Sequence, residues 1–435
     1  MALSYPLWRR LLVDITPLRE SPAYRHTWIG QLVSFLGTQM TMVALPVQVY
    51  RLTHSAFAVG LTGAVQLLPV LALGLLGGSI VDSADLRRVL LTTSSLLACG
   101  SGVLVAQAFA GLHELWLLYL MGAFLAALSA VDGPARSLLA PRLLPDARIP
   151  AASALTHLSL NVGLTAGPLL AGVLISWFGV GIAYSFDVLS FGYALYAIAR
   201  LRAMPSEGGG TPLGIRSIVE GLRWVRRQPV ILMTFLLDFD AMIFGMPRAL
   251  FPALAETHFY GDASTAGLLY SAPAIGALLG GVLSGPLGRI RRHGFAEIIS
   301  IAIWGLAITG FGLSPYLWVA VLLLGIAGAA DLASAVIRRD SATGNPRCPT
   351  RSHLRAIHYQ RHRRTPARRF GGRYSSRSSW GNGLGLERWV LCLLGLAALT
   401  AAYPAFARYS TFRTTSREPS ASTIKTGSED HRDDP

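Results

Sequence analysis

Among the ionisable residues within or at the ends of long apolar stretches, where a charge is costly and therefore rare, four are candidates for chemistry. They are Asp187, Asp238, Asp240 and Arg248. Asp238 and Asp240 lie about ten residues into the apolar run 229–252, and because they are two positions apart on a helix, we expect only one of them to face a central cavity. A carboxyl group in such a cavity can take up a proton on one side of a membrane and release it on the other. All four are therefore candidates for proton coupling or substrate binding.

Each of these candidates also has a structural interpretation. One acid of the pair Asp238 and Asp240 could form a hydrogen bond between helices or pair with an arginine. Asp187 lies near the expected outer end of the run 180–200 and could be an interfacial carboxylate. Arg248 could extend its side chain to the outer membrane surface.

Polar residues in the first apolar run have helical spacing. Gln31, Ser34 and Thr38 follow an i, i+3, i+7 pattern and so share one face of a helix. This face could line a transport pathway, or it could form ordinary hydrogen bonds between helices.

The sequence contains no motif that indicates an enzyme. A phosphate-binding loop of the Walker type needs Gly-Lys-Ser/Thr, and the only lysine is Lys425. The cysteines Cys99, Cys348 and Cys392 have neither the number nor the spacing of a disulfide framework or a zinc site. We therefore expect no catalytic residues, no metal and no cofactor.

Long apolar runs make up most of the chain. Of its 435 residues, 52% are hydrophobic and 14% are charged, and the mean hydropathy is +0.46. Soluble proteins carry roughly 25% charged residues. Runs of about 20 residues, which is the length that crosses a bilayer, lie at 27–49, 56–80, 88–110, 115–133, 152–177, 180–200, 229–252, 264–286, 295–313, 316–337 and 387–407. The expected fold class is an all-α membrane protein.

Arginines indicate the orientation of the chain. They concentrate in the gaps after even-numbered runs, and the gaps after odd-numbered runs hold almost none. The positive-inside rule then predicts a multi-pass protein of the cell (plasma or inner) membrane with a cytoplasmic N-terminus. The net charge of +15 comes largely from these arginines, so we expect no nucleic-acid partner. The segment 1–26 has no early apolar core with a cleavage site, so the first run should be retained.

A polar segment, 201–228, divides the chain into two parts. It opens with a flexible Ser-Glu-Gly-Gly-Gly sequence and continues into a basic amphipathic helix at 215–227, which lies on the inner leaflet or forms a solvated connector. Six runs (27–200) precede it and runs seven to ten (229–337) follow it. Glycines followed by an arginine cluster occur both after run two and after run eight, and parallel repeats of six spans are a known transporter design.

The gap after run two resembles a signature of the major facilitator superfamily. Gly78, Asp82, Arg87 and Arg88, which we call the loop motif, occupy its positions. The sequence departs from the signature at Ser83, Asp85 and Leu86, which stand where basic residues and a glycine are usual.

A second motif lies in run five. Gly163, Gly167, Pro168 and Gly172, which we call the span-five motif, resemble the GxxxGPxxGG pattern of exporters in this superfamily, with Ala171 in place of one glycine. Further segments resemble the enterobactin-exporter group of drug and siderophore efflux proteins, namely 44–53, 134–143 and 245–252.

The resemblance implies a fold and a function. The fold would be two six-helix bundles around a central cavity, and the chain would export a small amphipathic molecule, a drug or siderophore, in exchange for protons by alternating access. Its partners would be this substrate, protons and membrane lipid, and we expect a monomer. The loop motif would pack on the cytoplasmic end of an eleventh span, and the span-five motif would limit leakage. The alternatives are an importer of a metabolite, which the span-five motif argues against, and a transport-defective remnant that acts only as a membrane scaffold.

The segment 338–386 breaks the pattern of spans. It is rich in arginine, serine, glycine and proline and has no apolar run of span length, so that read literally it is a disordered basic loop. A last run at 387–407 would then carry the arginines of the polar tail 408–435 to the outside, against the positive-inside bias. We therefore predict that 339–385 is read in a shifted frame, and that the eleventh span is missing or scrambled.

Overall fold

The protein is described here by a computed structural model, and the structure describes residues 14–205, 248–282 and 293–343. Every regular element in these ranges is helical. Eight of the described helices are long and apolar enough to cross a membrane. The predicted all-α membrane fold is therefore confirmed. Three predicted features lie outside the described residues: the eleventh span, the last run 387–407 and, from residue 344 onward, the segment 338–386.

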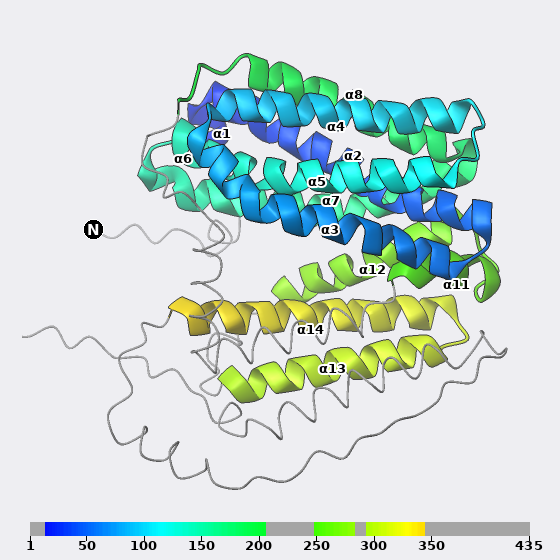
Figure 1. The fold of residues 1–435 in the computed structure, drawn as a ribbon. Coiled ribbons are helices and arrows are strands. Elements are labelled where there is room, and N and C mark those ends of the chain that lie inside the picture. The colour runs from blue at the N-terminus through cyan, green and yellow to red at the C-terminus, as the bar shows by residue number, and fades with distance from the viewer. Residues whose placement is uncertain (1–13, 206–247, 283–292, 344–435) are drawn as a thin grey trace, which may run out of the picture.

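The first part of the chain forms a bundle of six long helices (Figure 1). A short helix precedes it, and a short helix and a 3-10 turn link its fourth and fifth members. In order, the elements are α1 (Thr16–Glu20), α2 (Pro22–Thr53), α3 (Ala56–Ser83), α4 (Leu86–Phe109), α5 (Leu115–Ser137), α6 (Leu139–Leu143), η2 (Asp146–Arg148), α7 (Ile149–Phe178) and α8 (Val180–Ala199). The six long helices correspond to the six predicted runs of residues 27–200.

The second part of the chain contributes three long helices, which lie beside the first bundle in Figure 1. Its described elements are η3 (Arg248–Leu250), α11 (Phe251–Thr257), α12 (Ala263–Val282), α13 (His293–Leu313) and α14 (Leu317–Thr343). The three long helices correspond to the predicted runs eight, nine and ten. Of the predicted run 229–252, only the last five residues are described, and they lie in η3 and α11.

Local signals explain why α2 begins five residues before the predicted run. The hydroxyl of Ser21 accepts a hydrogen bond from the backbone N–H of Tyr24 at 3.2 Å, and Pro22 occupies the first helical position. Both residues are typical of a helix start. The helix ends at His54, which has a left-handed backbone conformation with φ of 46°.

Packing joins the helices in a fixed set of pairs. In the first bundle, α2 packs against α7 and α8, α3 against α5, and α4 against α5 and α8; in the second part, α12 and α13 both pack against α14. Large apolar side chains such as Trp177 and Leu189 are 75% exposed on the outside of the first bundle, as expected for a surface that faces lipid. We call the end that carries the arginine-rich loops after α3, α5 and α8 the inner end, and the opposite end the outer end.

The two parts of the chain meet mainly through α7 and α12. Smaller contacts join α3 to η3, and α2 to both α11 and α12. The segments η3, α11 and the start of α12 all lie at the outer end, so the described contacts between the two parts gather there (Figure 1).

Candidate functional site

The span-five motif brings α7 against α2. A methyl group added at Gly167 would lie 2.5 Å from Cβ of Gln39 and 3.3 Å from the carbonyl oxygen of Leu36. A methyl group at Gly163 would overlap the ring of Phe35. The first two glycines of the motif therefore allow close packing inside the first bundle.

The remaining motif residues face the other part of the chain. A methyl group at Gly172 would lie 2.8 Å from the carbonyl oxygen of Ala263 and 3.1 Å from Cα of Gly267. A methyl group at Gly267 would in turn lie 2.9 Å from Cα of Gly172 and would overlap the carbonyl oxygen of Pro168. The backbones of α7 and α12 are therefore in direct contact, and α7 packs on both parts of the chain. Sequence reasoning missed Gly267, because its partner is 95 residues away in the chain.

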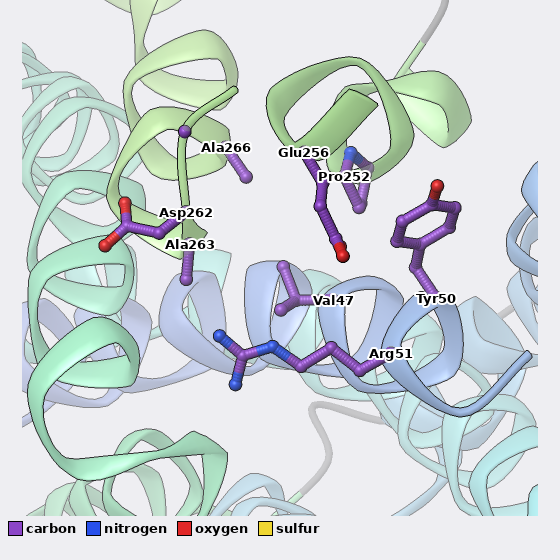
Figure 2. A pocket seen from close by; sticks show the side chains of 9 residues that line it. Val47, Tyr50, Arg51, Pro252, Glu256, Asp262, Ala263 and Ala266 are labelled. Atoms are coloured by element: carbon purple, nitrogen blue, oxygen red, sulfur yellow. The ribbon is translucent and has the colours of Figure 1, made fainter. Parts of the chain in front are cut away.

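A cavity of about 260 Å³ lies beside this contact at the outer end, and we call it the outer cavity. Figure 2 shows that Val47, Tyr50 and Arg51 line it from the end of α2, with Glu256 on α11 and Asp262 just before α12 opposite them. The side chain of Glu256 points from α11 toward α2, and that of Arg51 lies along α2 on the side of Asp262 (Figure 2). An arginine of one part therefore faces two carboxylates of the other part across the opening of the outer cavity, which we call the outer mouth. Sequence reasoning did not single out Arg51, Glu256 or Asp262 as site residues.

Asp262 is held by the start of α12. Its Oδ1 accepts hydrogen bonds from the backbone N–H of Ser264 at 2.9 Å and from the hydroxyl of Ser264 at 2.5 Å. These hydrogen bonds, with the hydroxyl of Ser264 contributing most, lower the pKa of Asp262 below its usual value, against a smaller opposing effect of burial. Asp262 is therefore ionised at physiological pH.

Asp187 is buried where α2, α4 and α8 meet. Its side chain is 2% exposed. Oδ2 accepts hydrogen bonds from the hydroxyls of Thr41 on α2 at 2.9 Å and Ser101 on α4 at 2.7 Å. Oδ1 is buried and has no hydrogen-bond partner among the described residues. The structure thus contradicts the interfacial interpretation, since the carboxyl group is enclosed by three helices.

A glycine on α2 makes room for this carboxyl group. A methyl group at Gly37 would lie 2.7 Å from Oδ1 of Asp187 and 2.6 Å from Oγ of Ser190. Ser34, one turn earlier, is 4% exposed, and Thr38 donates a hydrogen bond to the carbonyl oxygen of Ser34 at 3.0 Å. Ser34 and Thr38 thus fit the packing interpretation, whereas Gln31 lines a cavity at the inner end.

A second buried acid lies on α5, and sequence reasoning missed it. Asp132 forms an ion pair with Arg136 one turn later, and both side chains are 9% exposed. Asp132 also accepts a hydrogen bond from the hydroxyl of Thr93 at 2.7 Å, and Arg136 donates one to the hydroxyl of Ser94 at 3.1 Å. The i, i+4 spacing of opposite charges at the end of the run 115–133, with Asp132 inside it and Arg136 just beyond it, was the signal that could have found this pair.

The loop motif is only partly described, because the side chain of Asp82 lies outside what the structure describes. Arg87 donates a hydrogen bond to the carbonyl oxygen of Ala199 at the end of α8, at 2.7 Å. The backbone N–H of Arg88 donates to Oδ1 of Asp85, which caps α4. The expected contact of this motif with an eleventh span stays a prediction.

Asp85, which departs from the superfamily signature, has a second role. Its Oδ2 accepts a hydrogen bond from the backbone N–H of Met204 at 2.9 Å, and the backbone N–H of Leu86 donates to the carbonyl oxygen of Met204 at 3.0 Å. The loop between α3 and α4 is thereby fixed to the segment after α8.

The other predicted charged residues are not brought together by the described structure. Arg248 is the first residue of η3 and is exposed. Its carbonyl oxygen accepts a hydrogen bond from the hydroxyl of Tyr270 at 2.8 Å, and among the described ion pairs none includes its side chain. Asp238 and Asp240 lie outside the described residues.

Comparisons with known proteins agree with this architecture. A family model described as transmembrane secretion effector matches residues 13–343. The chain is 27% identical over 331 residues to the enterobactin exporter EntS of Citrobacter koseri. This alignment covers 75% of this chain and 78% of the relative. The chain is 26% identical over the same length, with the same coverage, to EntS of Shigella boydii.

Solved structures of transporters share the fold. The nucleoside transporter NupG aligns with a TM-score of 0.62 at 11% identity, over 89% of this chain and 100% of that one. A bacterial homologue of the iron transporter ferroportin, in its inward-facing state, aligns with a TM-score of 0.57 at 14% identity, over 88% of this chain and 98% of that one. At these identities the likeness establishes the fold alone.

Proposed function

The chain belongs to the transmembrane secretion effector family of the major facilitator superfamily, and from this premise we propose that it exports a small amphipathic molecule, a siderophore or drug, in exchange for protons. The cargo proposal draws on the relatives, which are named as enterobactin exporters. The family consists of membrane transporters, and this chain is a multi-pass transporter rather than an enzyme.

The contact between α7 and α12 is the observation that carries the proposal. Gly172 and Gly267 hold the two backbones together near the outer end, and Arg51 faces Glu256 and Asp262 beside them. An outer mouth closed in this way is one of the two states that alternating access requires. The second state would need the same contact to open, so we expect the two parts of the chain to separate at these glycines.

Proton coupling is supported by the position of Asp187. A carboxyl group inside a membrane helix is rare and usually functional. Two hydroxyls solvate Oδ2, and in the described residues no cation balances the group, so a proton is the simplest species that can neutralise it. Asp238 and Asp240 remain candidates for the same role.

Transport into inverted membrane vesicles tests this proposal. With enterobactin as the probe, an imposed proton gradient should drive its uptake by the wild-type chain, and Asp187→Asn should abolish this uptake while leaving exchange of enterobactin across the membrane. The amide keeps an oxygen that can accept from Thr41 and Ser101 but cannot titrate. Asp146→Asn, an exposed acid in η2, is the matched control and should behave as wild type.

Gradient-driven uptake that persists in Asp187→Asn would remove Asp187 from the coupling step, and the same assay would then be applied to Asp238→Asn and Asp240→Asn. Uptake that runs in the opposite direction would favour the importer.

One observation favours the remnant as a second candidate. The family match ends at residue 343, close to where the arginine-rich segment begins. A correctly inserted wild-type chain with neither gradient-driven uptake nor exchange would support a scaffold without transport activity.

A further inference from the structure

A second cavity, of about 190 Å³, lies at the inner end of the first bundle. We call it the inner cavity. It opens between the start of α2, the end of α5, α6 and the start of α7, far from the contact of α7 with α12. Its lining includes Tyr24, Trp28, Gln31, Arg136 and Ile149. Neither the proton step nor the outer mouth uses these residues, so the inner cavity needs an explanation of its own.

Arg136 gives the inner cavity a cation in a fixed position. Its Nε donates to Asp132 and its Nη2 donates to Ser94, so the guanidinium group cannot rotate freely. A guanidinium group has five N–H donors, and these two bonds use two of them. Both oxygens of Asp132 are already engaged, by Arg136 and by Thr93. The remaining donors of Arg136 are therefore available to an anion, and a planar fork of N–H groups suits a carboxylate.

Trp28 supplies a second, independent sign of a ligand. Its indole Nε1 is buried and has no hydrogen-bond partner among the described residues. Buried donors are almost always paired, so an orphaned one needs an explanation. Trp28 also lines the inner cavity, so a ligand oxygen there is a candidate partner for this N–H.

The start of α7 adds to the same preference. Ile149, the first residue of this 30-residue helix, lines the inner cavity. The N-terminus of a long helix carries a partial positive charge that favours a nearby anion. The aromatic residues Tyr24 and Trp28 and the apolar residues of α6 suit an apolar body. The remaining lining residues are polar, namely Thr27, Gln31, Ser137, Ser153, Thr156 and His157.

We propose that the inner cavity binds a small aromatic carboxylate, and that it holds the anionic part of the cargo on the inner side. The volume supports one ring, because an engineered cavity of about 150 Å³ binds benzene and the inner cavity measures about 190 Å³. The assignment to cargo rests on the proposed export function, whereas the binding of the anion does not.

Calorimetric titration of the purified full chain with benzoate tests the proposal, with benzamide as the uncharged analogue of the same shape. Benzoate should bind, and benzamide should bind at least about tenfold more weakly because it lacks the charge that Arg136 recognises. Trp28→Phe keeps an aromatic ring but removes the N–H together with the five-membered ring of the indole, so it should weaken benzoate at least about tenfold. Trp177→Phe, at a residue 75% exposed on the outside of α7, is the matched control and should bind benzoate as wild type does.

Equal affinity for benzoate and benzamide, or benzoate affinity unchanged in Trp28→Phe, would overturn the site. The titration is then repeated in nanodiscs of phosphatidylcholine and of phosphatidylglycerol. Binding of benzoate in both supports a site for a soluble anion, and its loss in phosphatidylglycerol alone would reassign the inner cavity to a lipid headgroup and overturn the cargo assignment.

The outcome is separable from the export proposal. Benzoate binding needs no proton gradient, so a chain that binds benzoate but moves no enterobactin refutes export and leaves the anion site standing. A chain that moves enterobactin but binds no benzoate refutes the anion site alone. Competition by benzoate, but not by benzamide, against enterobactin uptake would join the two.

Discussion

Gly267→Ala should open the outer mouth. The added methyl carbon would lie 2.9 Å from Cα of Gly172, which is about 0.6 to 1.1 Å closer than the optimal separation of two carbon atoms. Overpacking of this kind costs about 1–3 kcal/mol. Because the clash exists only while α7 and α12 touch, the cost falls on the closed state and should shift the population toward the open state by about 5- to 150-fold.

Thiol accessibility measures this shift. Val47 lines the outer cavity and is 4% exposed, so a cysteine there should react slowly with a membrane-impermeant reagent while the mouth is closed. In a Val47→Cys chain whose native cysteines are replaced, Gly267→Ala should accelerate labelling by about 5- to 150-fold. Gly192→Ala on α8 is the control, because a methyl group there meets no atom within 4 Å. Both substitutions gain the same helix propensity, so the difference between them reports the clash alone.

An unchanged labelling rate in a well-inserted Gly267→Ala chain would refute the reasoning. Equal acceleration by Gly192→Ala would do the same, because it would show that the effect comes from the helix backbone and not from the contact.

Two further predictions concern pH and the gene. Asp262 has a lowered pKa, so its charge is present above the usual value of about 3.9 and is lost only as pH falls through the lower folded value. Labelling of a cysteine at position 47 should therefore proceed at the same rate at pH 8 and pH 5. A mouth that opens between these two pH values would exclude Asp262 as the charged group that controls it. Resequencing the codons of 339–385 should reveal an apolar span in another frame, and the absence of such a span from both alternative frames would end the frameshift hypothesis.

Hydropathy was enough to predict the long helices of the described ranges, but not short elements such as α1, α6 and α11. The predicted runs 88–110 and 180–200 became Leu86–Phe109 and Val180–Ala199, because a bilayer requires about 20 apolar residues and a closed set of backbone hydrogen bonds. The start of α2 differed by five residues, since Ser21 and Pro22 extend the helix into the polar segment.

Contacts between distant residues could not be predicted in the same way. The sequence identified Asp187 as an unusual charge, but its partners Thr41 and Ser101 are 146 and 86 positions away, and each is an ordinary small polar residue in an apolar helix. Gly267 was hidden for the same reason. Asp132 and Arg136 differ, because their i, i+4 spacing along one helix is visible in the sequence itself.

The contact between α7 and α12 also has a consequence for the surrounding bilayer. Where Gly172 meets Gly267 and Ala263, the two backbones leave no room even for a methyl group. An acyl chain is wider than a methyl group, so lipid has no room to enter between the two parts of the chain where these backbones touch. If the proposed export takes place, the same glycines would close this seam to a hydrophobic cargo, which would then have to leave through the mouth into water.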